Sequence, residues 1–270
     1  MTETNTTQTP ADAKPMLEVR KLNKYFGGLR AVNDFDMTIH PGELVGLIGP
    51  NGAGKTTCFN MISGLYTPSS GDIILDGQEI HGLEPHEVTQ MGIGRTFQNI
   101  RLFPNLSVLD NVRVAYHIHA NYSMIDAIMR NNQFASQERE LTEKAQDFLA
   151  IFKLDRIQDE LAMNLPYGEQ RRVEIARALA SNPRLLLLDE PAAGMNPAEI
   201  VTLMELIHFV QERFNLTILL IEHQMRFVMG ICERITVMDF GEVIARGTPK
   251  EIQANPKVIE AYLGKGAVHA

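Results

Sequence analysis

Gly49-Pro50-Asn51-Gly52-Ala53-Gly54-Lys55-Thr56 is the stretch that decides the fold. Its spacing, G-x-x-x-x-G-K-[ST], is typical of a phosphate-binding loop. The apolar run before it, residues 43–48, predicts a buried strand. The segment after it, residues 57–64, predicts a helix that a glycine ends. A loop between a strand and a helix aims backbone N–H groups and a positive helix end at a polyphosphate, which argues against an ordinary glycine-rich turn.

The residue types in the loop predict how the phosphates are held. Glycines are needed because a Cβ would collide with a phosphate or forbid the turn. Lys55 supplies a point charge for the β- and γ-phosphate oxygens, and the Thr56 hydroxyl can bind Mg²⁺.

A second motif, Leu185-Leu186-Leu187-Leu188-Asp189-Glu190, indicates the type of nucleotide enzyme. The apolar run predicts a fully buried strand, whose acids emerge at the C-terminal sheet edge beside the phosphate loop. We expect Asp189 to hold the Mg²⁺ shell and Glu190 to orient and polarise the attacking water, because phosphoryl transfer depends on positioning and charge neutralisation. The alternative is a buried strand that ends in an acidic turn.

The composition limits the class of protein. The chain has 270 residues, of which 44% are hydrophobic and 21% charged, and this predicts one globular domain with or without a subdomain. Its formal net charge of −8 argues against a nucleic-acid partner. Two cysteines without paired spacing are typical of a reducing compartment and no structural metal. No apolar run approaches the roughly 18 residues of a membrane span. Residues 1–15 predict a disordered tail and no secretion signal, so we expect a soluble, cytoplasmic chain.

The remaining pattern predicts an α/β fold. Alternation within 16–40 and 72–77 predicts an antiparallel β layer beside the phosphate-loop strand, and 93–98 predicts a short strand running into a loop. We expect helices over 168–180, 197–214 and 256–263, a strand over 217–221, and a hairpin from 235–238 and 243–245.

Residues 111–164 have a different character, because glycine is absent and helical patterns dominate. One predicted helix face is made of Leu141, Ala145, Phe148, Leu149 and Phe152. We therefore expect a helical subdomain, about residues 100–181, inserted into a domain that spans 16–270.

In their order along the chain, these motifs resemble those of the ATP-binding subunits of ABC transporters, over about residues 17–263. Gln98 matches the family's glutamine between core and helical subdomain, and His223 its switch histidine. Phe26 matches its adenine-stacking aromatic residue, with Tyr25 a second candidate. Taken alone, His223 could be a satisfied histidine at a strand end, Gln98 a loop amide and Phe26 a core residue. The family's signature sequence corresponds here to Leu165, Pro166, Tyr167, Gly168, Glu169 and Gln170.

The resemblance implies the fold of a P-loop ATPase, in which a core with a mixed sheet carries a flanking antiparallel β layer and an inserted helical subdomain. It also implies ATP and Mg²⁺ as cofactors. The catalytic residues would be Glu190, His223 and Lys55, and the metal-binding residues Thr56, Gln98 and Asp189. The nucleotide would be bound by the eight residues of the phosphate loop together with Thr57, Phe26 and Gln98.

The resemblance further implies a head-to-tail pair of ATPase subunits, in which the signature of one subunit faces the phosphate loop of the other. Gly168, at a helix start, would offer backbone N–H groups to the γ-phosphate across the interface. Pro166 departs from the family by replacing the signature serine, and Asn196 by replacing an aspartate after the acidic motif. The first departure puts in doubt the strength of the ATP site that uses this signature. It does not affect the site on the chain's own phosphate loop.

Several segments resemble the larger of the two ATPase subunits of branched-chain amino acid importers: 94–98, 165–172, 191–197, the long helical insert near 116–139, and the ending 247–264. This resemblance implies a second ATPase subunit (in a hetero- or homodimer), two integral-membrane permeases and, indirectly, a periplasmic solute-binding protein. The chain would then lie at the cytoplasmic face of the inner membrane, held there by the permeases. The alternatives are the ATPase of lipopolysaccharide export, an amide or urea importer, and a non-transport ATPase such as one for iron–sulfur cluster assembly.

The loop after Gln98 bears on the transport role. Residues 100–106 are unusually apolar for a loop and predict a groove for a permease helix, with Leu102, Phe103 and Leu106 as anchors. The alternative is that Leu102 and Phe103 pack into their own subdomain.

Overall fold

A central six-stranded sheet carries the phosphate loop. The computed structural model describes residues 14–119, 124–129 and 131–263. Strand β10 is antiparallel to β9, and the other neighbouring pairs are parallel, so the predicted mixed sheet is confirmed. The order across the sheet is β10 (Glu242–Gly247), β9 (Arg234–Asp239), β3 (Leu44–Ile48), β8 (Thr217–Ile221), β7 (Leu185–Asp189) and β6 (Ile93–Arg95).

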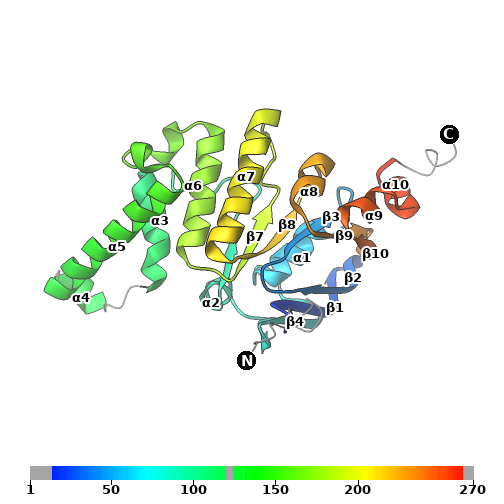
Figure 1. The fold of residues 1–270 in the computed structure, drawn as a ribbon. Coiled ribbons are helices and arrows are strands. Elements are labelled where there is room, and N and C mark those ends of the chain that lie inside the picture. The colour runs from blue at the N-terminus through cyan, green and yellow to red at the C-terminus, as the bar shows by residue number, and fades with distance from the viewer. Residues whose placement is uncertain (1–13, 120–123, 130, 264–270) are drawn as a thin grey trace, which may run out of the picture.

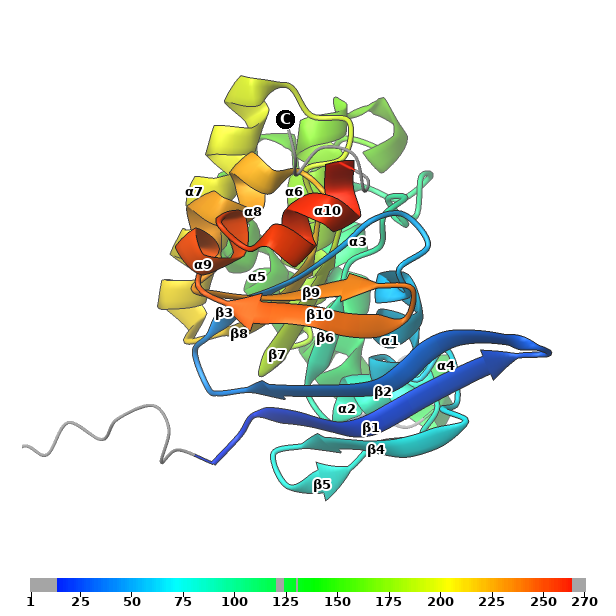
Figure 2. The same cartoon turned by 90° about the vertical axis from the view of Figure 1, so that its right-hand side faces the viewer.

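A second sheet is wholly antiparallel, as the alternation of apolar and polar residues predicts. Figure 2 shows it as a separate layer below the central sheet. Its order is β2 (Leu29–Ile39), β1 (Leu17–Phe26), β4 (Ser70–Leu75) and β5 (Gln78–Glu79).

Helices cover both faces of the central sheet. On one face, α1 (Lys55–Ile62) shares a core with the antiparallel sheet. On the other face, α6 (Tyr167–Ala180), α7 (Pro197–Phe214) and α8 (Met225–Ile231) pack against alternate strand residues. In β7, Leu185 and Leu187 pack into the core shared with α1 and the antiparallel sheet. Leu186 and Leu188 pack into the core on the other face, under α6, α7 and α8. A strand covered on both faces needs a continuous apolar run, which explains its sequence.

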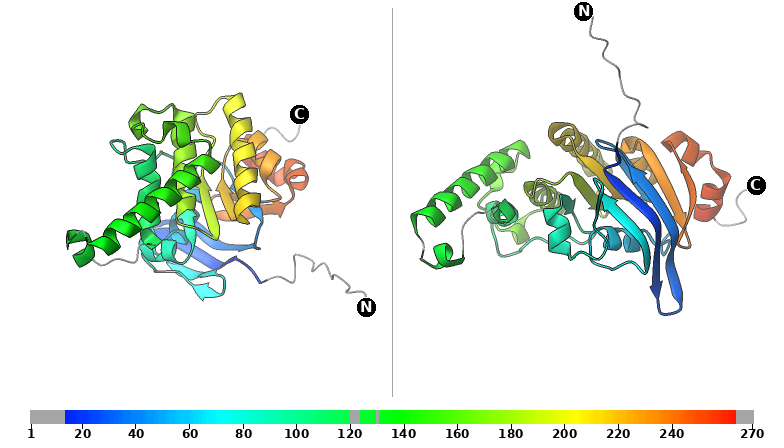
Figure 3. Two further views of the ribbon diagram at one scale, coloured as in Figure 1. Left: turned by 60° about the vertical axis from the view of Figure 1, so that its left-hand side comes forward. Right: turned by 90° about the horizontal axis from the view of Figure 1, so that it is seen from below.

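Most of the helices between β6 and β7 gather at one end of the molecule, away from the antiparallel sheet (Figures 1 and 3), whereas the last of them, α6, packs on the central sheet. On α5, the predicted face is buried and Phe152 is buried at the C-cap, which confirms that periodicity. The division of the chain into subdomains stays a prediction, and residues 120–123 and 130 lie outside the described part. The elements are α3 (Val108–Tyr116), α4 (Met124–Met129), α5 (Asn132–Ile151) and the 3-10 turns His117–His119, Asp155–Ile157 and Ala162–Asn164.

Local signals set the ends of α7. The Asn196 side chain accepts hydrogen bonds from the backbone N–H groups of Ala198 and Glu199, and Glu199 accepts one from the Asn196 N–H. At the other end, Asn215 adopts a left-handed conformation.

Of the helices near the C-terminus, α10 (Pro256–Leu263) confirms its prediction. The sequence pattern predicts no helix at the positions of α8, α2 (Pro85–Gln90) and α9 (Pro249–Gln253). The predicted disordered tail, apart from Lys14 and Pro15, lies outside the described residues.

Candidate active site

Four of the predicted site elements lie at one edge of the central sheet. The phosphate loop follows β3, the acids 189–190 end β7, His223 follows β8, and Gln98 lies after β6. Strands β3, β8, β7 and β6 are adjacent and parallel, so their carboxyl ends lie side by side. Ligands of open parallel sheets bind at this edge.

Two glycines of the phosphate loop are required by close backbone contacts. A Cβ on Gly49 would lie 2.0 Å from the carbonyl oxygen of Met238. A Cβ on Gly54, where φ is 100°, would lie 2.5 Å from the carbonyl oxygen of Ala31. The loop is therefore fixed between β9 and β2, and no larger residue fits at either position.

Backbone carbonyls of the phosphate loop hold the Lys55 side chain in place. The ammonium donates hydrogen bonds to the carbonyl oxygens of Gly49 (2.7 Å) and Pro50 (2.8 Å). Burial lowers the pKa of Lys55, and the nearby carboxylates of Glu190 and Asp189 oppose this shift. The lysine charge is thus fixed at the phosphate loop, close enough to the two predicted acids to interact with them electrostatically.

A hollow of about 350 Å³ opens beside the loop. Its volume is within the range of small-ligand sites. Phe26, the residue predicted to stack on adenine, lines it, and the second candidate, Tyr25, lies outside its lining. The stacking role stays a prediction. The loop residues that line it are Gly52, Ala53, Gly54, Lys55 and Thr56, followed by Thr57.

The hollow has a second aromatic wall that the sequence interpretation missed. Phe240 lies in the β9–β10 turn, has a φ of 43° and is 88% exposed. The next residue ties this turn to the phosphate loop, because the Gly241 N–H donates to the carbonyl of Ala53 at 3.1 Å. Both turn residues have positive φ, as a two-residue hairpin turn requires, so the turn geometry places Phe240 beside the hollow. The signal in the sequence that could have identified Phe240 is that it is an aromatic residue in a predicted hairpin turn.

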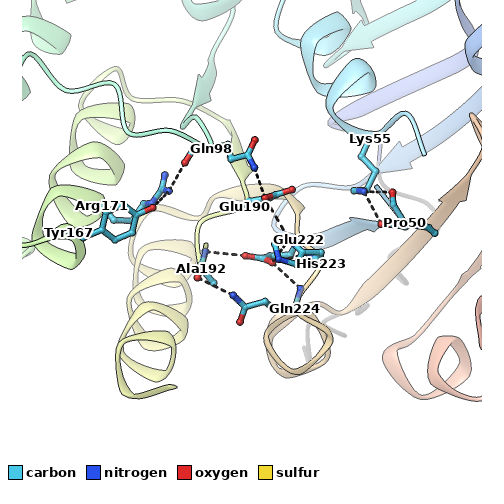
Figure 4. A network of polar contacts seen from close by, with 11 residues as sticks. Pro50, Lys55, Gln98, Tyr167, Arg171, Glu190, Ala192, Glu222, His223 and Gln224 are labelled. Atoms are coloured by element: carbon cyan, nitrogen blue, oxygen red, sulfur yellow. Dashed lines mark hydrogen bonds and ion pairs between the residues drawn. The ribbon is translucent and has the colours of Figure 1, made fainter. Parts of the chain in front are cut away.

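Glu190 lies at the centre of the polar contacts in Figure 4. Its Oε2 accepts a hydrogen bond from Gln98 Nε2 at 2.8 Å and lies 3.6 Å from His223 Nδ1. Its φ of 45° is in the left-handed region, and its N–H donates to the carbonyl of Ile221 at 2.9 Å. The structure therefore brings Gln98, Glu190 and His223 together, with the strained backbone that functional positions often carry.

Asp189 is paired with a residue that the sequence interpretation missed. Its Oδ2 lies 3.0 Å from Arg95 Nη2, and both side chains are buried. Arg95 also donates to the hydroxyl of Ser63. Burial raises the pKa of Asp189, while Arg95 opposes the increase. The arginine therefore offsets part of the cost of burying this carboxylate at the end of β7.

Glu222 is a second missed residue and connects the loops after β7 and β8. This buried carboxylate accepts hydrogen bonds from the N–H groups of Ala192 (3.0 Å), His223 (2.8 Å) and Gln224 (3.0 Å). Gln224 in turn donates to the carbonyl of Ala192 (3.1 Å). An acid directly after a buried strand, next to His223, was the signal available in the sequence.

The signature residues lie at the start of α6. Pro166 occupies the N-cap position, with Tyr167 and Gly168 in the first turn. Glu169 forms an ion pair with Arg172 at 3.0 Å. Leu165 is buried, and Gln170 donates to its carbonyl at 2.8 Å. Whether this helix start meets a second subunit stays a prediction.

An apolar hollow of about 510 Å³ lies beside the loop that follows Gln98. Phe103 lines it and is 48% exposed. Leu102 packs against the core, as the alternative interpretation predicts for it, and Leu106 lies outside the lining. Other lining residues are Leu65, Val88, Val114, Ile118 and Arg177.

The predicted metal-binding residues provide only oxygen donors. Among residues 14–119, 124–129 and 131–263, no three His, Cys, Asp or Glu side chains form a cluster that could hold a metal ion. Mg²⁺ does not need one, because it binds through one or two carboxylates plus substrate phosphates and water. The Thr56 hydroxyl, Gln98 amide oxygen and Asp189 carboxylate fit such an ion. In the described part of the chain, we also find no helix with the length and apolarity of a membrane span.

Comparison with known proteins gives two family matches. The model described as "ABC transporter" matches residues 32–193. The model described as "Branched-chain amino acid ATP-binding cassette transporter" matches residues 242–268. The second match includes β10, α9 and α10, beyond the motifs of the active site.

The chain is similar to proteins of known role. It is 46% identical to the high-affinity branched-chain amino acid transport ATP-binding protein BraF of Pseudomonas aeruginosa, over 94% of this chain and 99% of that protein. It is 37% identical to the lipopolysaccharide export system ATP-binding protein LptB of Escherichia coli, over 92% and 97%. Among solved structures, it resembles the ADP conformation of an ATP-binding cassette of an ABC transporter. That likeness has a TM-score of 0.81 and 31% identity, and covers 93% of this chain and 99% of the other.

Proposed function

The chain belongs to the ABC transporter family as an ATP-binding, ATP-hydrolysing subunit, and we propose that its transporter imports branched-chain amino acids. The observation that carries the ATPase assignment is the meeting of Lys55, Glu190, Gln98 and His223 at one sheet edge. The substrate class is supported by the family match over 242–268 and by the higher identity to BraF than to LptB.

In this proposal, the phosphate loop binds ATP through its backbone N–H groups and Lys55, and Phe26 and Phe240 flank the base. Glu190 accepts a hydrogen bond from Gln98, which fixes its carboxylate. The carboxylate orients and polarises the attacking water. His223 Nδ1 lies 3.6 Å from Glu190 Oε2. An imidazole that donates one hydrogen bond and accepts another can donate to a γ-phosphate oxygen and accept from an O–H or N–H group, so His223 links the phosphate to the protein beside Glu190.

Thr56, Gln98 and Asp189 would hold Mg²⁺ at the nucleotide. The ion neutralises charge that develops on the phosphate oxygens. Arg95 restricts Asp189 to one position, since it engages one of its two carboxylate oxygens. The Gln98 amide donates to Glu190 through nitrogen, which leaves its oxygen for the ion.

A second ATPase subunit completes each ATP site in this proposal. The start of α6, at Gly168, faces the γ-phosphate bound by the partner subunit. Pro166 has neither a hydroxyl nor an N–H, so it cannot donate a hydrogen bond there. The site that uses this signature is then the weaker of the two, which favours a heterodimer with unequal sites.

The hollow beside Phe103 is our candidate for permease docking. It is apolar and half-exposed Phe103 lines it, which suits an anchor from a short cytoplasmic helix. Two permeases would hold the chain at the cytoplasmic face of the membrane, with a periplasmic binding protein delivering the solute. Closure of the ATPase pair would pull both permeases and switch their access.

Reconstitution with the permeases and the binding protein tests this function. Vesicles that contain the complex should take up labelled leucine, isoleucine or valine only with ATP. The Phe103→Ala variant should lower uptake and loosen assembly while the isolated subunit keeps its basal ATPase activity. A matched control is Phe209→Ala, which removes a 43% exposed phenylalanine from α7. Uptake of an amide such as urea instead, or stimulation by lipopolysaccharide, would favour one of the alternatives.

A further inference from the structure

Among the residues that the structure describes, the largest completely buried side chain is a charged one, that of Arg171. Its Nη1 lies 2.6 Å from the carboxylate of Glu174, one turn along α6, and the two side chains are 0% and 1% exposed. Burial raises the pKa of Glu174, an effect that Arg171 opposes. Placing two charges in a core is costly, and apolar residues of similar size often serve stability equally well. A role other than stability therefore accounts better for this pair.

The pair binds the backbone around Gln98. Arg171 donates from Nη1 to the carbonyl of Phe97 (2.7 Å) and from Nη2 to the carbonyl of Gln98 (2.9 Å). Glu174 accepts from the N–H groups of Phe97 (3.4 Å) and Arg101 (3.2 Å). Four backbone groups of one loop are thus held by two side chains of one helix.

The same guanidinium reaches the signature sequence. Its Nη2 donates to the hydroxyl of Tyr167, the first residue of α6, at 3.1 Å. A continuous set of contacts therefore runs from Tyr167 through Arg171 to Gln98, and from Gln98 to Glu190 and His223 (Figure 4). The planar guanidinium can donate in several fixed directions at once, whereas a lysine ammonium is a compact charge on a flexible stem.

We propose that Arg171, held by Glu174, is a positioning residue that moves the signature start of α6 together with Gln98. The inference rests on the proposed function, in which Gln98 meets the ATP of its own subunit and the signature meets the ATP of the partner. Arg171 then connects the two ATP sites of the pair through the interior of one chain. A rigid connection of this kind transmits a change at one site to the other.

The test replaces the pair by apolar residues and measures coupling apart from stability. Arg171→Met combined with Glu174→Met removes both charges, so no unpaired carboxylate stays buried. The control, Arg139→Met combined with Glu143→Met, removes an exposed pair from α5. Arg171→Lys keeps a positive charge beside Glu174 but loses the fixed directions of the guanidinium donors. This variant allows the test to be made even if the double variant does not fold.

Three quantities are measured: the unfolding temperature of the full chain, its affinity for a fluorescent ATP analogue, and the kcat and KM of the assembled transporter. We expect the double variant to fold and to bind the analogue within about twofold of wild type. Its kcat should fall about tenfold with little change in KM, a loss typical of site-to-site coupling, and Arg171→Lys should show the same split. When the double variant also carries Glu190→Gln, ATP should no longer trap the two ATPase subunits in the closed state.

Wild-type kcat in a folded double variant or in Arg171→Lys would overturn the inference. Loss of analogue binding in the isolated chain would overturn it as well, since that result indicates a purely structural role. A wild-type transporter that fails to hydrolyse ATP would instead contradict the proposed function, so the two failures are distinguishable.

Discussion

Replacing Arg95 by methionine should destabilise the protein strongly, because Asp189 would lose its buried partner. Arg95 and Asp189 lie 3.0 Å apart with side chains 8% and 5% exposed. Removing one member of a buried ion pair costs about 3–5 kcal/mol. A typical domain has only about 5–15 kcal/mol of stability, so the loss is a large share of it. Arg139→Met, whose partner Glu143 is exposed, should change stability little.

The destabilisation should depend on pH in a defined direction. Burial already raises the pKa of Asp189 in the folded protein, and loss of Arg95 raises it further. When the pKa of a carboxyl group is higher in the folded than in the unfolded state, the free energy of unfolding of the protein falls as the pH rises towards the folded-state pKa. The cost of Arg95→Met should therefore be complete at high pH and shrink as the pH falls and Asp189 takes up a proton.

The assay is urea unfolding of wild type, Arg95→Met and Arg139→Met, at about pH 8 and about pH 6. Circular dichroism is the suitable probe, since the chain has no tryptophan. An Arg95→Met variant as stable as wild type at the higher pH would show that the Arg95–Asp189 pair does not stabilise the fold. A loss that grows on acidification would refute the pH argument alone.

Three further predictions concern the nucleotide. His223→Ala should abolish hydrolysis with an unchanged unfolding temperature, because the 48% exposed imidazole contributes little packing; unchanged hydrolysis would contradict its role. Pro166→Ser should tighten closure or speed turnover at the weaker site, since a hydrogen bond to a charged group is worth about 1.5–3 kcal/mol. Equal binding and hydrolysis at both sites, with and without that change, would exclude unequal sites. Phe240→Ala should weaken ATP binding about fivefold or more by loss of base stacking, while tripolyphosphate binds as before and the control Phe209→Ala matches wild type. Equal losses for ATP and tripolyphosphate would show that Phe240 acts on the loop.

Elements with strong local signals could be predicted from the sequence. Helix α7 begins and ends at the predicted residues because Asn196 and Pro197 start it and Asn215 ends it. The buried strands β7 and β8 follow from their continuous apolar runs. Helices α2, α8 and α9 have five to seven residues, too few to show a helical period.

Contacts between distant residues could not be predicted in the same way. Arg95 and Asp189 are 94 residues apart, and Arg171 is 73 residues from Gln98. A single sequence shows which residues are charged, but it does not show which distant residues they contact in the fold. Leu102 illustrates the same limit, because only the folded packing separates it from its exposed neighbour Phe103.

The most direct test of the account is ATP affinity and turnover of the Glu190→Gln variant in the assembled transporter, measured separately. If Glu190 polarises the water, the variant should bind ATP with wild-type affinity and be trapped by ATP as a closed pair. Its turnover should be lower by about 10²–10⁴-fold, because the amide cannot take a proton. Lys55→Ala, measured beside it, should instead lose nucleotide binding. Turnover near wild type in Glu190→Gln would contradict the assignment of this carboxylate and, with it, the proposed mechanism.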